Sequence, residues 1–574
     1  MNRREVIGAL LAAPAAANAA DAVAAAPLSV RGEANLAAFA RLVAYVRFFH
    51  PSDAAATTDW NAFVVSNVET VEGARSPADL VARLDTMFRP IAPTMTLHAR
   101  KTPPAPAALP AGAGQLVMWT HRGVGLPAPP SARPNIYASK RVPVPDGQPK
   151  VLSLSLGEGV SATMPTTAYS EQTPPEGPLL QMPAATPSAE DRRIRLANII
   201  LAWGVLQHFY PYFDVVPVDW DAELTKGLRA SAQDADAAAF SKTLAHMIAA
   251  LRDGHGEVSE AKPRWYLPVA WAWIEDRLVV TAAPATAQDL PVGGVITRID
   301  GVEVAPLIAA LEKQVSAATP HSRRARTLFR LRARLDKAAA TLEGQAADGA
   351  TFKALLTPTD WPTANAVNAR AVHANFSEPS PGVVYVDLSR VSEQDVRDKL
   401  PLLAQAKGVV FDDRGYPSGS ARRLLAHFSD RPLHSARFEV PLITAPDRQD
   451  ITFDGGGGWT LPPQTPRLTG RLVLLTGGEA ISYAESWAGV FEGERIGPIV
   501  GGPTAGTNGN INWIPLPGRY GVTFTGMRVR KHDGSPHHGV GILPTVPVAQ
   551  TIAGVRAGRD EVLERGVALA AGEA

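Results

Sequence analysis

Three uninterrupted apolar runs beyond Pro381 place the strongest constraint on the fold. GVVYVDL begins at Gly382, GVVFDD at Gly408 and RLVLLTG at Arg471. Runs without polar alternation suit strands that are buried on both faces of a sheet, and helical stretches such as SARRLLAHF and YAESWAGVF separate them. The pattern therefore predicts a mainly parallel α/β core.

Composition narrows the class of protein. A chain of 574 residues is too long for one hydrophobic core, so three or four domains are expected, and 45% apolar residues are enough to build them. Lys and Arg total 56 against 55 Asp and Glu, which gives no electrostatic reason to expect a nucleic acid partner. The absence of cysteine excludes disulfides, a thiol nucleophile and Cys-ligated zinc. No apolar run reaches the length that stable membrane insertion needs.

The N-terminus resembles a twin-arginine export signal. Arg3 and Arg4 precede an apolar run from Val6 to Ala13, and small residues follow. Charged, apolar and small segments in this order are typical of export signals, whereas a frayed Ala-rich tail is the plainer alternative. Residues 1–25 are therefore predicted to be an export signal, and the mature protein to be periplasmic or secreted.

Two segments resemble copies of one helical unit. RLVAYVRFFHPSD begins at Arg41 and IILAWGVLQHFYPYFD at Ile199, and an Asp-Trp pair follows each of them. Each segment then continues through a second helical pattern to a histidine, His98 or His255. The repeated order predicts a duplicated helical unit. The two units are expected at 26–104 and 188–262.

Two further domains are expected between the helical units and the core. Residues 105–187 are rich in Pro and Gly and contain short alternating runs, which predicts a small β-domain. Residues 263–357 contain GGVITRIDG, which resembles the glycine turn and strand of a PDZ domain, a module that binds an extended peptide as an added strand. The α/β core would then occupy 358–574.

Ser482 is the strongest candidate nucleophile. In RLVLLTGGEAISYAESWAGVFEG a buried strand ends at Thr476, and Ser482 stands just before a helical stretch that begins near Tyr483. A serine there can use the positive end of the helix, and nearby backbone N–H groups can bind an oxyanion. The alternative is an N-cap, with Glu485 three residues later completing a capping box. The local pattern by itself favours the cap.

His255 is the candidate general base. It lies in LRDGHGEVS, after a helical stretch rich in Ala and Leu. A serine hydroxyl is weakly nucleophilic until a base accepts its proton, and neutral histidine suits this role near pH 7. A lone histidine at a helix end is more commonly a cap or a surface group.

The order of these motifs resembles that of the tail-specific, or C-terminal processing, serine peptidases. A helical segment, Asp-Gly-His, a PDZ-like module, a strand with Asp-x-Arg-Gly and Ser-x-x-Glu at a helix start follow one another between residues 190 and 550. The similarity is closest to the tricorn-like and retinoid-binding-protein-like branch. This resemblance implies a crotonase- or Clp-protease-like core and a peptide or protein substrate, with no metal and no cofactor.

The resemblance also implies an oxyanion hole. GVVFDDRGYPSGS stands where the family has its Asp-Leu-Arg-Gly-Asn-x-Gly-Gly loop. By analogy, this loop and the backbone N–H of Tyr483 form the hole, with Gly415 or Gly419 as the second donor.

Two positions depart from the family pattern. Thr507 occupies the place where the tail-specific branch has its lysine base, which leaves the base role to His255. His538 occupies the place where the tricorn-like branch has a glutamate, and a histidine cannot replace a carboxylate as the group that orients an imidazolium. The missing carboxylate could come from Asp533, Glu485 or Glu257. Alternatively, His538 could join another polar network.

Two functions follow from the sequence. The first is an exported serine peptidase that uses a Ser482/His255 pair. The second is an inactive binding protein for a peptide or hydrophobic ligand on the same scaffold, which the change to His538 and the altered Asp-Arg-Gly-Tyr loop motivate. Retention of both Ser482 and His255 favours the peptidase.

Overall fold

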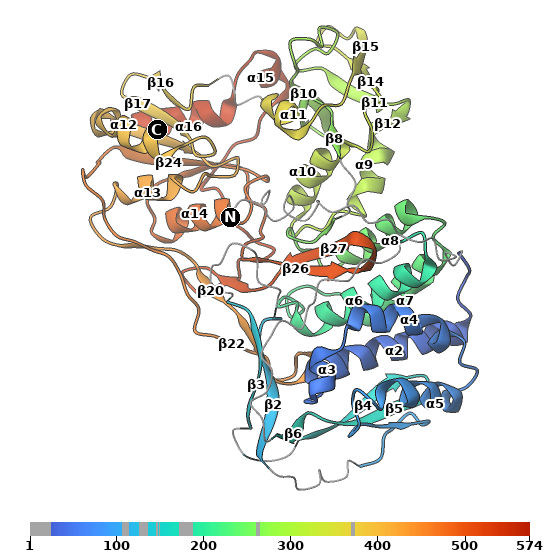
Figure 1. Cartoon of the computed structure of the whole chain (residues 1–574). Coiled ribbons are helices and arrows are strands. Elements are labelled where there is room, and N and C mark those ends of the chain that lie inside the picture. Colours follow the sequence, from blue (N-terminus) through green and yellow to red (C-terminus); the bar gives the residue numbers. More distant parts are fainter. Residues whose placement is uncertain are drawn as a thin grey trace.

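The computed structural model (Figure 1) shows several packed units, with the α/β core at the upper left of the view, a smaller module beside it and the helical units below. The predicted export signal falls almost entirely in residues 1–24, outside the described part of the chain. Within the described part, no helix combines the length and apolar character that crossing a bilayer requires. The structure describes residues 25–105, 114–125, 136–144, 147, 150–170, 188–259, 264–368 and 373–573.

The core is built on a six-stranded sheet of order β16-β17-β18-β24-β25-β29. Only the β16–β17 pair is antiparallel, so the sheet is mainly parallel, as the apolar runs predict. Val384 and Val386 face one layer with Trp487, while Val383 and Tyr385 face a second layer. This alternation explains why the strands are apolar throughout. The sheet strands are β16 (Phe376–Ser380), β17 (Val383–Asp387), β18 (Gly408–Asp412), β24 (Arg471–Thr476), β25 (Ile499–Gly501) and β29 (Val546–Pro547).

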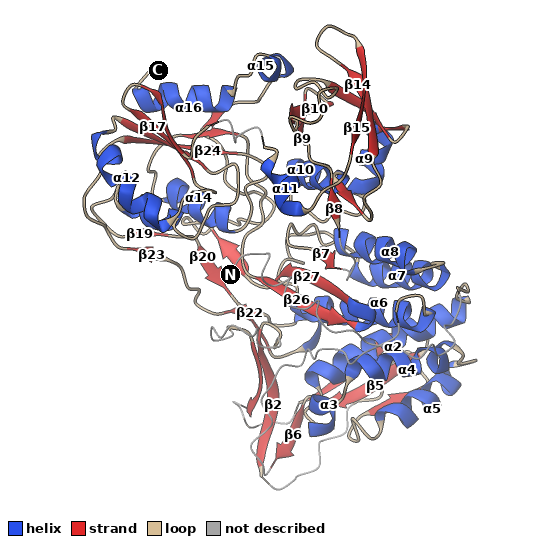
Figure 2. Ribbon diagram, turned by 45° about the horizontal axis from the view of Figure 1, so that its top comes forward, coloured by secondary structure: helices blue, strands red, loops and turns tan. Residues whose placement is uncertain are grey.

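Helices cover both faces of this sheet, as Figure 2 shows. The apolar layer around Trp487 includes residues of α12, α13 and α14, and the opposite layer includes residues of α16. The core helices are α12 (Glu393–Gln405), α13 (Ala421–Ala426), α14 (Tyr483–Gly493), α15 (Ile552–Arg556) and α16 (Glu561–Ala571).

The two helical units share one hydrophobic core. In each unit a helix begins at the Trp of the Asp-Trp pair, because the Asp59 or Asp219 side chain accepts a backbone N–H as the N-cap. The first unit contains α2 (Val30–Phe49), α3 (Asp53–Thr57), α4 (Trp60–Glu72), α5 (Pro77–Phe88) and β1 (Thr96–His98). The second contains α6 (Arg192–Phe209), α7 (Trp220–Gln233), α8 (Ala237–Ala249) and β7 (Glu257–Ser259).

Each unit also ends in a short strand at the edge of a three-stranded antiparallel sheet. β1 pairs with the hairpin of β4 (Val151–Gly157) and β5 (Val160–Pro165). β7 pairs with the hairpin of β26 (Ile511–Leu516) and β27 (Tyr520–Thr525), which comes from the α/β core. The second unit is therefore joined to the core by strand pairing.

The strands of residues 105–187 do not form one separate sheet. β2 (Gln115–Arg122) pairs with β3 (Ala138–Pro143), β6 (Thr167–Ser170) and the distant β21, whereas β4 and β5 pair with β1. The partner of β2 lies in an excursion from the core, residues 433–461, that we call the strap. Figure 1 shows the strap extending from the core to the β2–β3 hairpin. Its elements are β19 (Leu433–His434), β20 (Arg437–Glu439), β21 (Pro441–Ile443), η2 (Pro446–Arg448), β22 (Thr452–Phe453) and β23 (Thr460–Leu461).

Asp447 in the strap contacts both helical units. Its carboxylate accepts hydrogen bonds from the Tyr45 hydroxyl at 2.7 Å and from the Gln207 side chain at 2.9 Å. The strap also pairs with the core through β20 and β28 (Arg528–Arg530). It therefore links both helical units to the core.

A separate module occupies residues 264–368, between the second helical unit and the core. It contains an antiparallel sheet of order β15-β14-β11-β10-β9, with its own apolar core. Its strands are β8 (Trp265–Tyr266), β9 (Ala270–Ile274), β10 (Arg277–Ala282), β11 (Val295–Ile299), β12 (Val302–Glu303), β13 (Ala333–Arg334), β14 (Ala340–Gln345) and β15 (Thr351–Leu356). Its helices are α9 (Val304–Glu312), α10 (Pro320–Leu331) and α11 (Trp361–Ala366).

Candidate active site

Ser482 occupies a sharp turn between β24 and α14. Its backbone has φ 61° and ψ −110°, a left-handed conformation that costs a non-glycine residue about 1–3 kcal/mol. Its carbonyl nevertheless accepts the N–H of Ser486 at 2.9 Å, so the helix starts directly from it. Strained strand-to-helix turns of this kind expose a nucleophilic serine at the edge of a sheet.

The capping box that the spacing predicts is present, but it does not account for the strain. Ser482 and Glu485 form the box, and the Glu485 carboxylate accepts the Ser482 N–H at 3.3 Å. An N-cap residue ordinarily has an extended backbone, which a serine adopts without cost. The left-handed conformation of Ser482 therefore needs a reason beyond capping.

Glu485 holds the nucleophile turn against the loop 504–507. Its buried carboxylate accepts hydrogen bonds from the Thr504 hydroxyl at 2.6 Å, from Gly506 N–H at 2.7 Å and from Thr507 N–H at 2.9 Å. His537 Nε2 lies 3.2 Å from the same carboxylate. Burial alone would raise the pKa of Glu485, but His537 and these hydrogen bonds outweigh burial and hold it below its usual range.

His255 is bound to Asp253 through a threonine hydroxyl. The Thr525 hydroxyl donates to Asp253 Oδ1 at 2.6 Å and lies 2.9 Å from His255 Nδ1. Its single proton points to the carboxylate, so its oxygen accepts the proton of Nδ1. This arrangement selects the tautomer in which Nε2 carries the lone pair, which is the form that a general base requires. We call the three residues the Asp253–Thr525–His255 relay.

Asp253 is fixed in place by its other hydrogen bonds. The carboxyl group is fully buried, and it accepts the N–H of His255 at 2.9 Å and the N–H of Thr525 at 2.6 Å. Two of its donors are backbone groups, which cannot swing away. The relay is therefore preorganised.

Thr507 brings the nucleophile turn and the relay together. Its hydroxyl accepts the Gly254 N–H at 3.0 Å, and its carbonyl accepts the Ser482 N–H at 2.9 Å. A Cβ atom on Gly254 would stand 2.7 Å from Thr507 Oγ1 and 2.9 Å from Ile481 Cδ1, so only glycine allows this approach. Thr507, at the position where a lysine base was expected, thus holds two segments in register.

The other sequence candidates lie in different surroundings. Glu257 forms an ion pair with Arg326 at 2.9 Å, which ties β7 to α10. Asp533 is exposed and accepts hydrogen bonds from Ser535 N–H and from the Ser535 hydroxyl, so its carboxylate serves a surface turn. This environment gives Asp533 no place in the relay.

His538 is buried beside the relay. Its ring stacks on Tyr212 with centroids 4.0 Å apart, and its charge would interact with both Asp253 and Glu485. Burial is the main cause that lowers the pKa of His538. A neutral, stacked ring at the position of the family's glutamate suits packing against the site.

The loop after β18 lies next to the start of α14. β18 and β24 are parallel neighbours, so the loops that follow them leave the same edge of the sheet. Arg414 fixes the loop through ion pairs with Asp412 at 2.7 Å and Asp560 at 2.8 Å. The rings of Tyr416 in this loop and Tyr483 lie 6.1 Å apart.

The predicted oxyanion donors lie on these two neighbouring segments. Gly415 and Gly419 lie in the loop after β18. Tyr483 is the first residue of α14, where a backbone N–H has no acceptor within the helix.

The sequence reasoning missed two residues of the relay. Asp253 lies in the LRDGHGEVS motif, and its position two residues before His255 is the sequence signal for an orienting carboxylate. Thr525 lies 270 residues from His255 and no local pattern marks it. Only the pairing of β7 with β27 brings it to the histidine.

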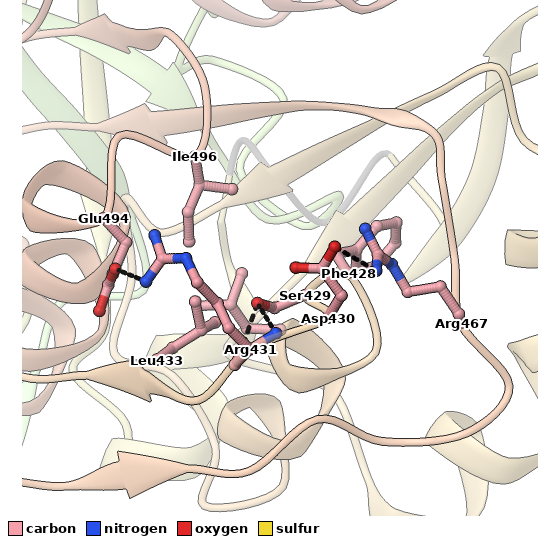
Figure 3. A pocket seen from close by; sticks show the side chains of 9 residues that line it. Phe428, Ser429, Asp430, Arg431, Leu433, Arg467, Glu494 and Ile496 are labelled. Atoms are coloured by element: carbon pink, nitrogen blue, oxygen red, sulfur yellow. Dashed lines mark hydrogen bonds and ion pairs between the residues drawn. The ribbon is translucent and has the colours of Figure 1, made fainter.

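A pocket of about 170 Å³ lies away from this site (Figure 3). It includes Glu494, which caps the C-terminal end of α14, roughly 18 Å along the helix from Ser482. Its charged groups form the pairs Arg431–Glu494 and Arg467–Asp430. They neutralise one another, so the pocket offers no obvious chemistry. Within the described ranges, no group of three or more His, Asp or Glu side chains could hold a metal ion.

A protein-family model matches part of the α/β core. The family model of peptidase family S41 matches residues 382–548, which include Ser482 but not His255. No curated protein sequence matches the chain.

Solved structures resemble a larger part of the chain. The structure of mature CPAF complexed with lactacystin is 15% identical, with a TM-score of 0.53, and the match covers 66% of this chain and 98% of that one. The photosystem II D1 C-terminal processing protease is 18% identical, with a TM-score of 0.38 and coverage of 63% and 97%. The likeness to CPAF shows that the fold extends well beyond the segment that the family model matches.

Proposed function

We propose that this chain, which belongs to peptidase family S41 and is a serine-type peptidase, cleaves polypeptides through an acyl-enzyme formed on Ser482, with His255 as the base. The observation that carries the proposal is the Asp253–Thr525–His255 relay, held by Thr507 against the strained turn of Ser482.

The first half of the reaction forms the acyl-enzyme. Ser482 Oγ attacks the scissile carbonyl carbon, and His255 Nε2 accepts the hydroxyl proton. The Nδ1 proton stays on the resulting imidazolium and is donated to Thr525 Oγ1. The Thr525 hydroxyl in turn donates to the Asp253 carboxylate. The negative charge of Asp253 thereby stabilises the imidazolium through one intervening hydroxyl.

The second half returns the enzyme to its starting state. His255 gives its proton to the leaving amine, and the C–N bond breaks. Water then attacks the acyl carbon while His255 accepts its proton. His255 gives this proton to Ser482 Oγ as the ester bond breaks, which releases the acid and restores the serine hydroxyl.

The oxyanion is assigned to backbone donors. Tyr483 N–H is the first donor, and Gly415 or Gly419 in the facing loop is the second. The ion pairs of Arg414 support this assignment, because they hold the loop that carries both glycines. Loss of one oxyanion donor costs about 10²–10³ in kcat.

The module of residues 264–368 is proposed to bind substrate as a PDZ-like domain. β9 is an edge strand of its sheet, and α10 packs beside it, with Trp271 Nε1 donating to the Leu328 carbonyl at 3.0 Å. An edge strand beside a helix can accept an extended peptide as an added strand.

The protein is proposed to act in the periplasm or outside the cell. The Arg3-Arg4 pair and the apolar run after it support export. Fractionation of cells that express the full chain should place the processed protein outside the cytoplasm, and Arg3→Lys/Arg4→Lys should retain it inside. Equal export of both proteins would contradict this proposal.

A fluorophosphonate probe tests the chemistry directly. The full chain should be labelled at Ser482, as mapped by mass spectrometry of the labelled peptide, and it should cleave an unfolded polypeptide. Ser482→Ala should lose both properties. Ser392→Ala is the matched control, because Ser392 also begins a helix in a capping box but lies outside the proposed site, so both properties should stay unchanged. A folded protein that neither reacts nor cleaves would favour the binding-protein alternative.

A further inference from the structure

Four aromatic side chains gather immediately beside the nucleophile. They come from three segments: the loop after β18, the strap and the start of α14. The ring of Tyr483 lies 5.4 Å from Trp459 and 6.1 Å from Tyr416, and Trp459 stacks on Phe438 at 5.9 Å. We call Tyr416, Phe438, Trp459 and Tyr483 the aromatic cluster.

Much of the aromatic cluster remains accessible. Tyr416 is 43% exposed, and Trp459 and Tyr483 are partly exposed. Phe438 packs beneath them against Tyr137 and Met527, so it supports the stack from below. Single exposed aromatic rings are common, but adjacent rings from distant segments form an apolar surface that water covers poorly.

The position of the aromatic cluster indicates what covers it. Tyr483 follows Ser482 directly, and its N–H is assigned to the oxyanion. A surface attached to that residue lies within reach of the side chains that flank a scissile bond. Ring faces favour stacked or edge-on contacts with another ring, and burial of a large apolar side chain supplies binding energy.

One cation adjoins the aromatic cluster. The Arg422 guanidinium lies 5.3 Å above the Trp459 ring. Burial raises the pKa of Tyr483, and the charge of Arg422 offsets only part of that rise. Because Arg422 already lies over one face of the Trp459 ring, its positive charge disfavours binding of a basic substrate side chain at this surface. The surface therefore suits an uncharged ring.

We propose that the aromatic cluster is a subsite for an aromatic side chain next to the scissile bond, with Trp459 and Tyr416 determining specificity. This inference rests on the proposed function. It assigns to the strap a second role, since Trp459 and Phe438 belong to the strap. The strap thus supplies part of the substrate surface as well as the link to the helical units.

The test compares peptides that differ by one residue. Fluorogenic peptides carrying Phe, Ala or Lys at either residue beside the scissile bond are assayed with the full chain. Phe at one of these positions should raise kcat/KM about 10- to 100-fold over Ala. Trp459→Ala should reduce this preference to less than about threefold, mainly through KM. Trp459→Phe should keep most of it.

A matched control separates the subsite from general damage. Phe453 in β22 has the Arg528 guanidinium 3.4 Å over its ring, so Phe453→Ala removes a cation-capped ring of the strap that lies outside the aromatic cluster. It should retain the preference for Phe. The rate of fluorophosphonate labelling at Ser482 should be unchanged in Trp459→Ala, because the small probe does not need the subsite.

Binding measurements keep this inference separate from the chemistry. In Ser482→Ala, calorimetry should show the Phe peptide binding at least about tenfold more tightly than the Ala peptide, and Trp459→Ala in that background should remove the difference. This result would support the subsite even if the wild-type chain cleaved nothing. Equal affinity for the Phe and Ala peptides, or a preference that Trp459→Ala leaves intact, would overturn the proposal.

Discussion

The two helical units have the same architecture, yet only the second carries the proposed chemistry. Strand register aligns Thr96 of β1 with Glu257 of β7, because each lies opposite a threonine in its hairpin. The turn Ala92-Pro93-Thr94 then stands where the second unit has Asp253-Gly254-His255. The difference shows that a three-residue turn, and not the helical scaffold, carries the site.

The comparison also corrects the sequence interpretation of His98. The repeated pattern paired His98 with His255, but His98 lies within β1, where its Nε2 is 3.1 Å from Thr163 Oγ1. His255 lies in the turn before β7 and contacts Thr525. A histidine at a similar distance along both copies was therefore not an equivalent residue.

The largest expected contrast compares equivalent positions of the two turns. His255→Ala should lower kcat/KM by about 10²–10⁴, because Ser482 loses its base. Thr94→Ala, at the aligned position, should keep activity within about twofold, since Thr94 hydrogen-bonds only His50 among the described side chains. Rates with one peptide substrate and thermal unfolding of both variants provide the check. Full activity of His255→Ala would assign the base elsewhere.

The second contrast concerns the threonines that contact a histidine. Thr525→Val should lower kcat about 10- to 100-fold, because the imidazolium loses its hydrogen-bonded link to the Asp253 carboxylate. Thr525→Ser should restore most of the rate. Thr163→Val removes the threonine–histidine contact of the first unit, which the register does not align with the relay, and should leave kcat unchanged. A pH profile of kcat separates a role in the base from simple loss of stability, since only the former moves the acidic limb.

The third contrast concerns stability in acid. Burial lowers the pKa of His50 and of His121, both packed against the first unit, to about 4. Below about pH 6.5 these histidines become protonated in the unfolded chain but stay neutral in the folded protein. The free energy of unfolding therefore falls as the pH falls, by about 1.4 kcal/mol per pH unit for each histidine, down to about pH 4.

Urea unfolding near neutral pH and near pH 5.5 measures this effect. His121→Gln should flatten the pH dependence, whereas the partly exposed His98 should contribute less. If His121→Gln unfolds with the pH dependence of the wild type, His121 does not contribute to the loss of stability in acid. If activity is lost in acid while the protein stays folded, the loss would then come from a titrating group of the second helical unit.

The smallest contrast compares how much stability is lost when Trp60 or Trp220 is replaced, and we expect the two losses to be nearly equal. The Trp60 N–H donates to the Ala55 carbonyl at 3.0 Å, and the Trp220 N–H donates to the Trp203 carbonyl at 3.2 Å. Trp60→Phe and Trp220→Phe should each lower the free energy of unfolding by about 0.5–1.5 kcal/mol, because each loses one buried hydrogen bond. Denaturant titration should find similar losses. A large difference would show that the two units do not share their stability equally.

The sequence predicted the parts that depend on local pattern. Buried apolar runs predicted the mainly parallel core, and the Asp-Trp pairs predicted the repeated helices, because caps and periodicity act within a few residues. The strap was not predicted, because β21 pairs with β2 more than 300 residues away. The same reason hid Thr525. Residues that meet only through distant strand pairing leave no signal in their own surroundings.

The pairing of β7 with β27 also has a consequence for the timing of assembly. During synthesis the segment that carries His255 emerges long before β27 and Ser482. Contacts so distant along a chain form late and slowly, because a long loop must close first. A partly made chain therefore holds His255 without Thr525 and without Ser482. The proposed catalytic pair cannot form until synthesis of the chain is almost finished.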